Sequence, residues 1–108
     1  MGRRFQLPPL DLIQGFEVAA RTLSFTKAAE ELNLTQSAVS RQVRALEEHL
    51  GVALFERRTR ALLLTAEGRR LQKTAEDALN LLQDATNRIR ADASARHLTV
   101  STTAGFAS

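Results

Sequence analysis

Two short amphipathic helices, separated by about three residues, restrict the fold of this chain more than any other feature of its sequence. Residues 25–32, FTKAAEEL, carry apolar side chains at the i, i+3, i+4 and i+7 positions of one helix face, and Ser24 is a good N-cap. Residues 34–51, LTQSAVSRQVRALEEHLG, predict the next helix, capped by Thr35 and ended by Gly51. A turn this short between two helices is typical of a helix-turn-helix.

The helix predicted at residues 35–50 has two unlike faces. At roughly 100° per residue, the aliphatic side chains from Val39 to Leu50 share one narrow side and predict a core contact. The opposite side carries a polar and basic set, namely Gln36, Ser37, Ser40, Arg41 and Arg44. A solvated surface is the simplest explanation of such a face, so another observation is needed to make it a binding site.

Three details of this polar face favour DNA as its partner. Its first half has no acidic residue before Glu47, although surface helices usually pair Glu with Lys. Its serines and its amide have lower helix propensity than Ala, Glu or Lys. From Gln36 to Arg44 the helix rises about 12 Å, which is comparable with the width of the major groove, and Arg and Gln pair bidentately with guanine and adenine.

A basic hairpin is predicted after Gly51. Short apolar runs at residues 52–55 and 61–64 flank the sequence ERRTR, residues 56–60. Two short strands joined by this tip would form a wing beside the helix-turn-helix, whereas a plain exposed loop is the alternative. Beside a helix-turn-helix, arginines at such a tip favour contacts with phosphates or with the minor groove, because backbone contacts position a reading helix.

Two further helices complete the prediction. Residues 8–23 open with two prolines, which suit a helix start, and then place apolar side chains three and four positions apart. Thr65 is a suitable N-cap for a long helix that runs to about Ala91. This helix has a heptad seam made of Leu71, Ala75, Ala78, Leu82, Ala85 and Ile89. We expect the seam to pair two copies in a homodimer; the alternative is that it packs back on its own domain, as its first turns are expected to do.

The last residues change period. Apolar or β-branched side chains from Leu98 to Thr102 alternate with polar ones, which is a strand signal with no partner strand after it. Either the chain is a fragment cut at the start of a second domain or the tail is disordered, and we favour the fragment, with a flexible tail. The predicted fold class is all-α with a small β wing. Its parts are a winged helix-turn-helix over residues 1–65, a linker helix over 66–92 and the start of a truncated domain over 93–108.

Composition argues against several functions. The chain has 108 residues, no Cys and two His far apart, so no disulfide, thiolate metal site or acid–base constellation is recognisable. Gly51 and Gly68 stand alone and form no phosphate loop. We therefore expect no enzyme, cofactor or metal site. No apolar run suits a signal peptide or a membrane span, which predicts a soluble, cytoplasmic protein without a membrane partner. The net charge of +3 weakly favours an anionic partner.

Residues 23–71 resemble the DNA-binding domain of the LysR-type transcriptional regulators. The resemblance depends on four pieces in this order: SFTKAAEEL, TQSAVSRQVRALEEHLG, LFERRTR and LLLTAEG. Residues 7–32 further resemble the branch that includes the glycine-cleavage and β-lactamase regulators. The resemblance implies a winged helix-turn-helix, a linker helix that pairs two subunits, and a carboxy-terminal effector-binding domain of two α/β lobes. Only the first strand of that domain, residues 97–101, would be present, so a small-molecule effector is expected only in a full-length parent.

The resemblance also implies roles for individual residues. The base readers would be Gln36, Ser40 and Arg41, with Arg44 nearby. Close to phosphates at the N-terminus of the reading helix would lie Thr35 and Ser37. The residues that would hold the DNA backbone, or reach the minor groove from the wing, are Ser24, Thr26, Lys27, Arg57, Arg58 and Arg60.

Together these inferences predict a function in transcription regulation. A homodimer would bind an interrupted palindrome in double-stranded DNA sequence-specifically, in association with the nucleoid. The alternative is a helical interaction module whose heptad seam recruits a protein partner and whose basic face is incidental. That alternative predicts a stable helical dimer with no preference among DNA sequences.

Overall fold

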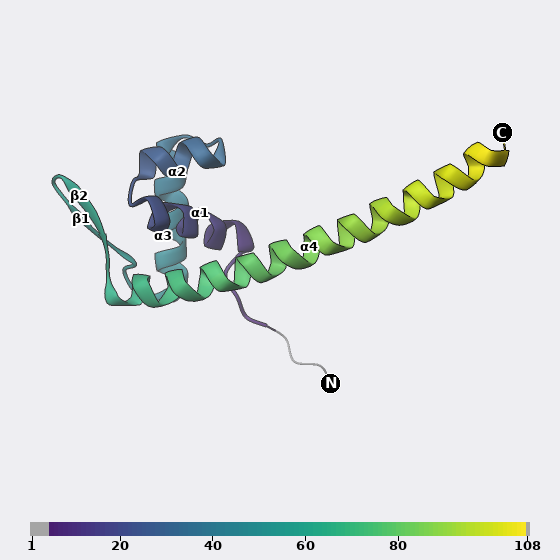
Figure 1. Cartoon of the computed structure of the whole chain (residues 1–108). Coiled ribbons are helices and arrows are strands. Elements are labelled where there is room, and N and C mark those ends of the chain that lie inside the picture. Colours follow the sequence, from purple (N-terminus) through teal and green to yellow (C-terminus); the bar gives the residue numbers. More distant parts are fainter. Residues whose placement is uncertain (1–4, 108) are drawn as a thin grey trace. The chain divides into compact units, whose positions relative to one another are not determined.

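The computed structural model describes the backbone of residues 5–107 and the side chains of residues 5–96. Figure 1 shows the elements in chain order, which are α1 (Leu10–Thr22), α2 (Phe25–Leu32), α3 (Gln36–Leu50), β1 (Phe55–Arg58), β2 (Ala61–Leu64) and α4 (Ala66–Ala107). The chain divides into two compact units, a first unit of residues 1–76 and a second unit of residues 77–108. The predicted fold class, all-α with a small β wing, is confirmed.

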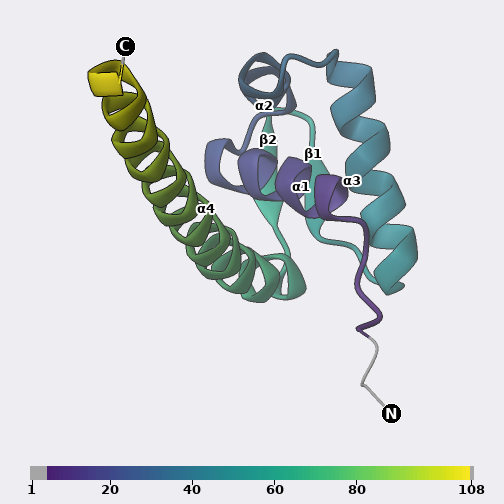
Figure 2. The same ribbon diagram turned by 90° about the vertical axis from the view of Figure 1, so that its right-hand side faces the viewer.

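The core of the first unit lies among the three short helices and the root of the hairpin. Figure 2 shows α2 and α3 beside α1, and both helices contact α1. Ala28 and Ala29 are buried on α2, where their small side chains allow the neighbouring helices to approach closely. The largest side chains that are fully buried in this core are Phe16, Leu46, Leu54, Val39 and Val43.

Side-chain caps fix the helix starts where the sequence predicts them. The Ser24 hydroxyl accepts a hydrogen bond from the Lys27 N–H at 3.1 Å, and the Thr35 hydroxyl accepts one from the Ala38 N–H at 3.0 Å. Asn33 ends α2 in the left-handed conformation with φ of 56°, so only three residues separate α2 from α3. The predicted helix-turn-helix is therefore confirmed.

The hairpin of β1 and β2 is antiparallel, with Phe55 opposite Leu64 and Arg58 opposite Ala61. Two residues, Thr59 and Arg60, connect the strands. The predicted wing is confirmed, but its first strand begins at Phe55, whereas the sequence placed that strand at residues 52–55. Period and composition do not show this shift, because the register is fixed by the short turn and by burial of Phe55.

The carboxy-terminal prediction was wrong in its helix end and its strand. The sequence predicted an end near Ala91 and a strand over residues 97–101, but α4 continues to Ala107. A strand needs a neighbouring strand for its backbone hydrogen bonds, and in the described chain β1 and β2 pair with each other. A helix satisfies those bonds within the segment. The division into a linker helix and a further domain from residue 93 stays a prediction.

No helix in the described part of the chain is long and apolar enough to cross a membrane.

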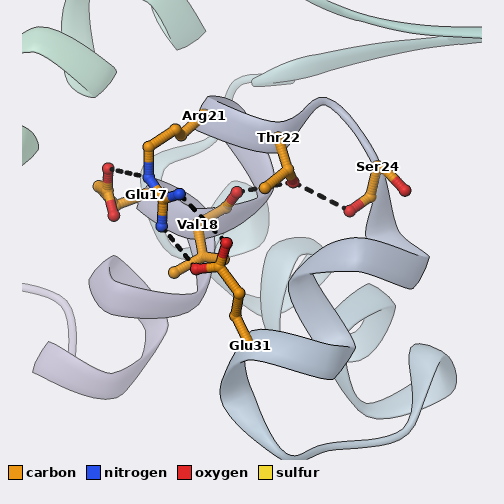
Figure 3. Close-up of polar contacts among 6 residues, drawn as sticks. All are labelled: Glu17, Val18, Arg21, Thr22, Ser24 and Glu31. Carbon is orange, nitrogen blue, oxygen red and sulfur yellow. Dashed lines mark hydrogen bonds and ion pairs between the residues drawn. The ribbon is translucent and has the colours of Figure 1, made fainter.

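An ion-pair network joins α1 to α2 on the surface (Figure 3). The Arg21 guanidinium donates to a Glu31 carboxylate oxygen at 2.7 Å and to Glu17 at 3.3 Å. The Thr22 hydroxyl donates to the Val18 carbonyl at 2.8 Å and also lies 3.1 Å from the Ser24 carbonyl oxygen. The hydrogen bond from Arg21 holds the pKa of the Glu31 carboxyl below its ordinary value of 4.5.

Glu31→Gln is expected to make folding stability less dependent on pH. Because the pKa of Glu31 is lowered in the folded state, its stabilising contribution is present above 4.5 and is lost as pH falls below that value. Denaturant unfolding of both proteins over a pH series should show a stability gap at neutral pH that closes in acid. Glu30 is exposed on the same helix, so Glu30→Gln is the control. An equal stability gap for this variant would contradict the role given to Glu31.

Gly68 lies where α4 passes close to the backbone before β1. A Cβ at this position would overlap the Leu54 carbonyl oxygen and crowd the Leu64 side chain. That carbonyl already accepts a hydrogen bond from the Thr65 N–H at 3.0 Å, so it is not free to move away. The first turn of α4 therefore requires glycine for close approach.

Gly68→Ala is expected to destabilise the chain by about 1–3 kcal/mol through overpacking. Helix propensity alone predicts the opposite sign, because alanine is favoured over glycine in a helix by about 1 kcal/mol. The free energy of unfolding in urea distinguishes the two. The exposed neighbour Glu67→Ala serves as the control, and a stabilised Gly68→Ala chain would show that the contact with Leu54 relaxes freely.

Candidate nucleic-acid interface

One open hollow of about 810 Å³ lies between the start of α2, the start of α3 and the hairpin. It brings together seven of the twelve residues predicted to contact DNA, which are Thr26, Gln36, Ser37, Ser40, Arg57, Arg58 and Arg60. These residues are separated by up to 34 positions, 60 minus 26, in the sequence. The fold therefore builds a shared surface from the helix-turn-helix and the wing.

The apolar side of α3 determines which residues face outward. Val39, Val43 and Leu46 have no exposed surface and fix the rotation of the helix about its axis. The predicted readers lie on the other side, where Gln36, Ser37, Arg41 and Arg44 are exposed and Ser40 is partly exposed. Arg41 and Arg44 do not line the hollow; they extend the same outward face toward the C-terminus of α3.

The other predicted contacts lie at the helix starts. Ser24 and Thr35 are N-caps, and each uses a lone pair of its hydroxyl oxygen to accept a backbone N–H. Each hydroxyl keeps its O–H as a donor, so capping and a phosphate contact are compatible. Lys27 is exposed in the first turn of α2.

A hydrogen bond crosses the turn of the helix-turn-helix. The Thr26 hydroxyl donates to the Gln36 side-chain oxygen at 3.3 Å. This contact directs the amide group so that its nitrogen is left as a donor toward solvent. Thr26, predicted only as a backbone contact, thus also touches one of the predicted readers.

The two adjacent wing arginines have different partners. The guanidinium carbon of Arg57 lies over the Phe25 ring, 5.0 Å from its centroid. Arg58 instead donates to the Glu56 carboxylate at 2.6 Å. Residues alternate between the two faces of a strand, so Arg57 shares the side of Phe55 and Arg58 shares that of Glu56. The sequence showed only a run of arginines and did not separate these roles.

A carboxylate from α3 fixes the root of the wing. One oxygen of Glu47 accepts the backbone N–H of Leu54 at 2.8 Å and that of Phe55 at 3.3 Å. Sequence reasoning missed Glu47 because an acid near the end of a helix looks like ordinary surface charge. The wing and α3 are therefore joined by polar contacts as well as by the core.

Glu47→Ala is expected to cost about 1.5–3 kcal/mol of stability, because it leaves two backbone N–H groups without their charged acceptor. Urea unfolding followed by circular dichroism measures this loss. The adjacent exposed residue supplies a matched control, and Glu48→Ala should change stability by less than about 0.5 kcal/mol. Equal effects of the two substitutions would contradict the role given to Glu47.

The predicted dimer seam is divided between the two units. In the first unit, Leu71 packs partly buried against the core, and Ala75 is only 3% exposed. In the second unit, Leu82 is 53% exposed and Ile89 is 66% exposed within the single chain. Ala78 and Ala85 are exposed as well. The first two seam residues therefore pack within the first unit. This is what the sequence analysis expected of the first turns of the helix.

No group of three or more potential metal-ligating side chains occurs in the described part of the chain. His49 is exposed in the last turn of α3. The hollow brings together hydroxyls, an amide and arginines from two helices and a hairpin, which suits hydrogen bonding to an anionic polymer.

Comparison with known proteins identifies relatives of this chain. Residues 10–69 match the family model described as bacterial regulatory helix-turn-helix protein, LysR family. The chain is 47% identical over 102 residues to the glycine cleavage system transcriptional activator of Escherichia coli K12, covering 94% of the chain and 33% of the relative. It is 53% identical over 81 residues to the HTH-type transcriptional activator AmpR of Pseudomonas aeruginosa, covering 75% of the chain and 25% of that relative. The chain thus spans a third or less of the length of these relatives.

Solved structures of two DNA-binding domains have a similar fold. The structure superposes on BenM DBD in a complex with benA site 1 DNA with a TM-score of 0.74 at 33% identity, covering 81% of this chain and 98% of that one. CbnR DBD in a DNA complex gives a TM-score of 0.70 at 34% identity, covering 80% and 99% of the two chains. Both similar chains were solved on DNA.

Proposed function

The chain belongs to the LysR family of bacterial regulatory helix-turn-helix proteins, and from this we propose that it binds double-stranded DNA sequence-specifically in transcription regulation. The observation that carries the proposal is the single surface shared by the outward face of α3 and the wing arginines. The similar BenM and CbnR chains, solved in DNA complexes, support it. The transcriptional activators among the relatives support the regulatory role.

Recognition would combine base reading with backbone contacts. In this proposal α3 enters the major groove, where Gln36, Ser40 and Arg41 reach base edges and Arg44 lies beside them. The N-terminal groups Thr35 and Ser37 would lie near phosphates. The remaining backbone and minor-groove contacts would come from Ser24, Thr26, Lys27, Arg57, Arg58 and Arg60.

Two copies would be needed for an interrupted palindrome. The exposed apolar residues Leu82 and Ile89, with Ala78 and Ala85 between and beside them, form an unpartnered heptad stripe in the second unit. Pairing of two such stripes would bury this surface and set the distance between two reading helices. We place the complex in the cytoplasm, on the nucleoid, and assign a small-molecule effector only to a longer parent chain.

Arg41→Ala is expected to weaken binding to the preferred duplex by about 1–3 kcal/mol and to relax the preference at one position of each half-site, because a bidentate contact to a base edge is lost. Binding isotherms on the preferred duplex and on duplexes with single base-pair changes measure both effects. An equal loss on preferred and scrambled duplexes would remove Arg41 from the readers.

The experiment that tests the proposed function is selection of bound duplexes from a randomised library at near-physiological salt. An enriched interrupted palindrome supports both base reading and dimerisation. An enriched half-site supports reading but contradicts pairing through α4 alone. No enrichment contradicts the proposal and favours a helical protein-interaction module.

If the dimer neutralises ~6–10 phosphates, affinity should fall by roughly 10³–10⁵ between 50 and 200 mM salt.

A further inference from the structure

We propose that Phe25 is a positioning residue that orders Arg57 for DNA contact before DNA arrives, whereas the neighbouring Arg58 is oriented by an ion pair with Glu56 and not by a ring. The inference rests on the proposed function. It assigns different roles to two arginines that are adjacent in the sequence and that a count of basic residues treats alike.

The contact between Arg57 and Phe25 provides the first step. The guanidinium carbon lies 5.0 Å from the ring centroid, within the range of a cation–π interaction. Both residues line the hollow beside the N-terminus of α3, and Arg57 is exposed. Within the described residues the Arg57 guanidinium makes no hydrogen bond or ion pair, so its N–H donors remain for an anion.

The Phe25 ring is itself held in place by another ring, so its contact with Arg57 can orient the guanidinium. Its edge-to-face contact with Phe55 has a centroid distance of 5.6 Å and an interplanar angle of 85°. Phe55 contacts Phe16 in the same way, also at 5.6 Å, and Phe16 has no exposed surface. A chain of three rings therefore connects the Arg57 guanidinium to the centre of the core. A free arginine loses rotamer freedom when it binds, and Arg57 has lost part of it already.

Arg58 lies under the opposite constraint. Its guanidinium is paired with Glu56 at 2.6 Å on the other face of β1, and among the side chains of residues 5–96 it lies over no aromatic ring. Its Nε and Nη2 groups both donate to one Glu56 carboxylate oxygen, so a negative charge already lies beside this guanidinium. Arg58 is therefore the matched control: the same side chain on the same strand, without the ring.

A double-mutant cycle on duplex affinity tests the inference. Phe25→Leu should weaken binding about 2- to 5-fold in the wild-type background, as expected from an exposed cation–π contact, and have little effect in the Arg57→Ala background. With Arg58→Ala the same substitution should be additive. An equal Phe25→Leu effect in the presence and absence of Arg57 would overturn the proposal.

The salt dependence separates positioning from loss of a contact. Arg57→Ala should reduce the slope of log affinity against log salt by about 1 for each bound protomer, because one phosphate contact per protomer disappears. Phe25→Leu should lower affinity with the slope unchanged, because Arg57 still reaches its phosphate. A slope reduced by Phe25→Leu as much as by Arg57→Ala would contradict a positioning role.

Two variants guard against a general folding defect. Phe25→Tyr keeps the ring and should retain wild-type affinity. Pentafluorophenylalanine at position 25 keeps a similar shape but reverses the ring electrostatics, so it should reproduce the Phe25→Leu loss in the wild-type background and have little effect in the Arg57→Ala background. Wild-type affinity for this variant would overturn the inference. Absence of duplex binding by the wild-type chain would instead reject the proposed function and the inference with it, so the two failures are distinguishable.

Discussion

The packing of the Phe55 ring is the contact on which the rest of the first unit depends. Phe55 is the first residue of β1, is only 5% exposed, and contacts the rings of Phe16 in α1 and Phe25 in α2. A two-stranded hairpin is marginally stable by itself, so its direction has to come from such a contact with the helices. The backbone N–H of Phe55 is also held by Glu47 of α3. One residue thus ties the wing to all three short helices, which is why the wing and α3 can present one surface.

Several residues at this surface have structural duties as well as proposed contacts with DNA. Ser24 and Thr35 cap helices, Thr26 contacts Gln36, and Arg57 lies over an aromatic ring. Such residues are placed by the fold before any ligand is present. A preorganised surface loses less conformational entropy on binding than a set of free side chains. The hydroxyl groups are well suited to this double use, because they accept a bond from the backbone and still donate one outward.

The local part of this organisation was predictable from the sequence because it depends on near neighbours. The caps at Ser24, Thr35 and Thr65 act over three residues and were predicted correctly. The apolar side of α3 was predicted correctly up to Leu46, but Leu50, expected on the same side, is 41% exposed. The contacts of Glu47 and Phe25 were not predictable, because they join positions whose pairing depends on the register of the hairpin. The tail from residue 97 was predicted wrongly because alternation alone cannot supply a partner strand. The roles of the predicted DNA contacts remain predictions, although the fold brings seven of them to one hollow.

The proposed role of the polar face of α3 is to read base edges in the major groove. The most direct measurement replaces each purine of the selected duplex, in turn, with a deaza analogue that lacks the N7 acceptor, and compares affinities. N7 faces the major groove in both guanine and adenine, and it is the acceptor that Arg and Gln use. Base reading by α3 predicts a large loss at a few discrete purines in each half-site and no loss elsewhere. Affinity that is unchanged at every purine would contradict major-groove reading and leave only contacts with the DNA backbone.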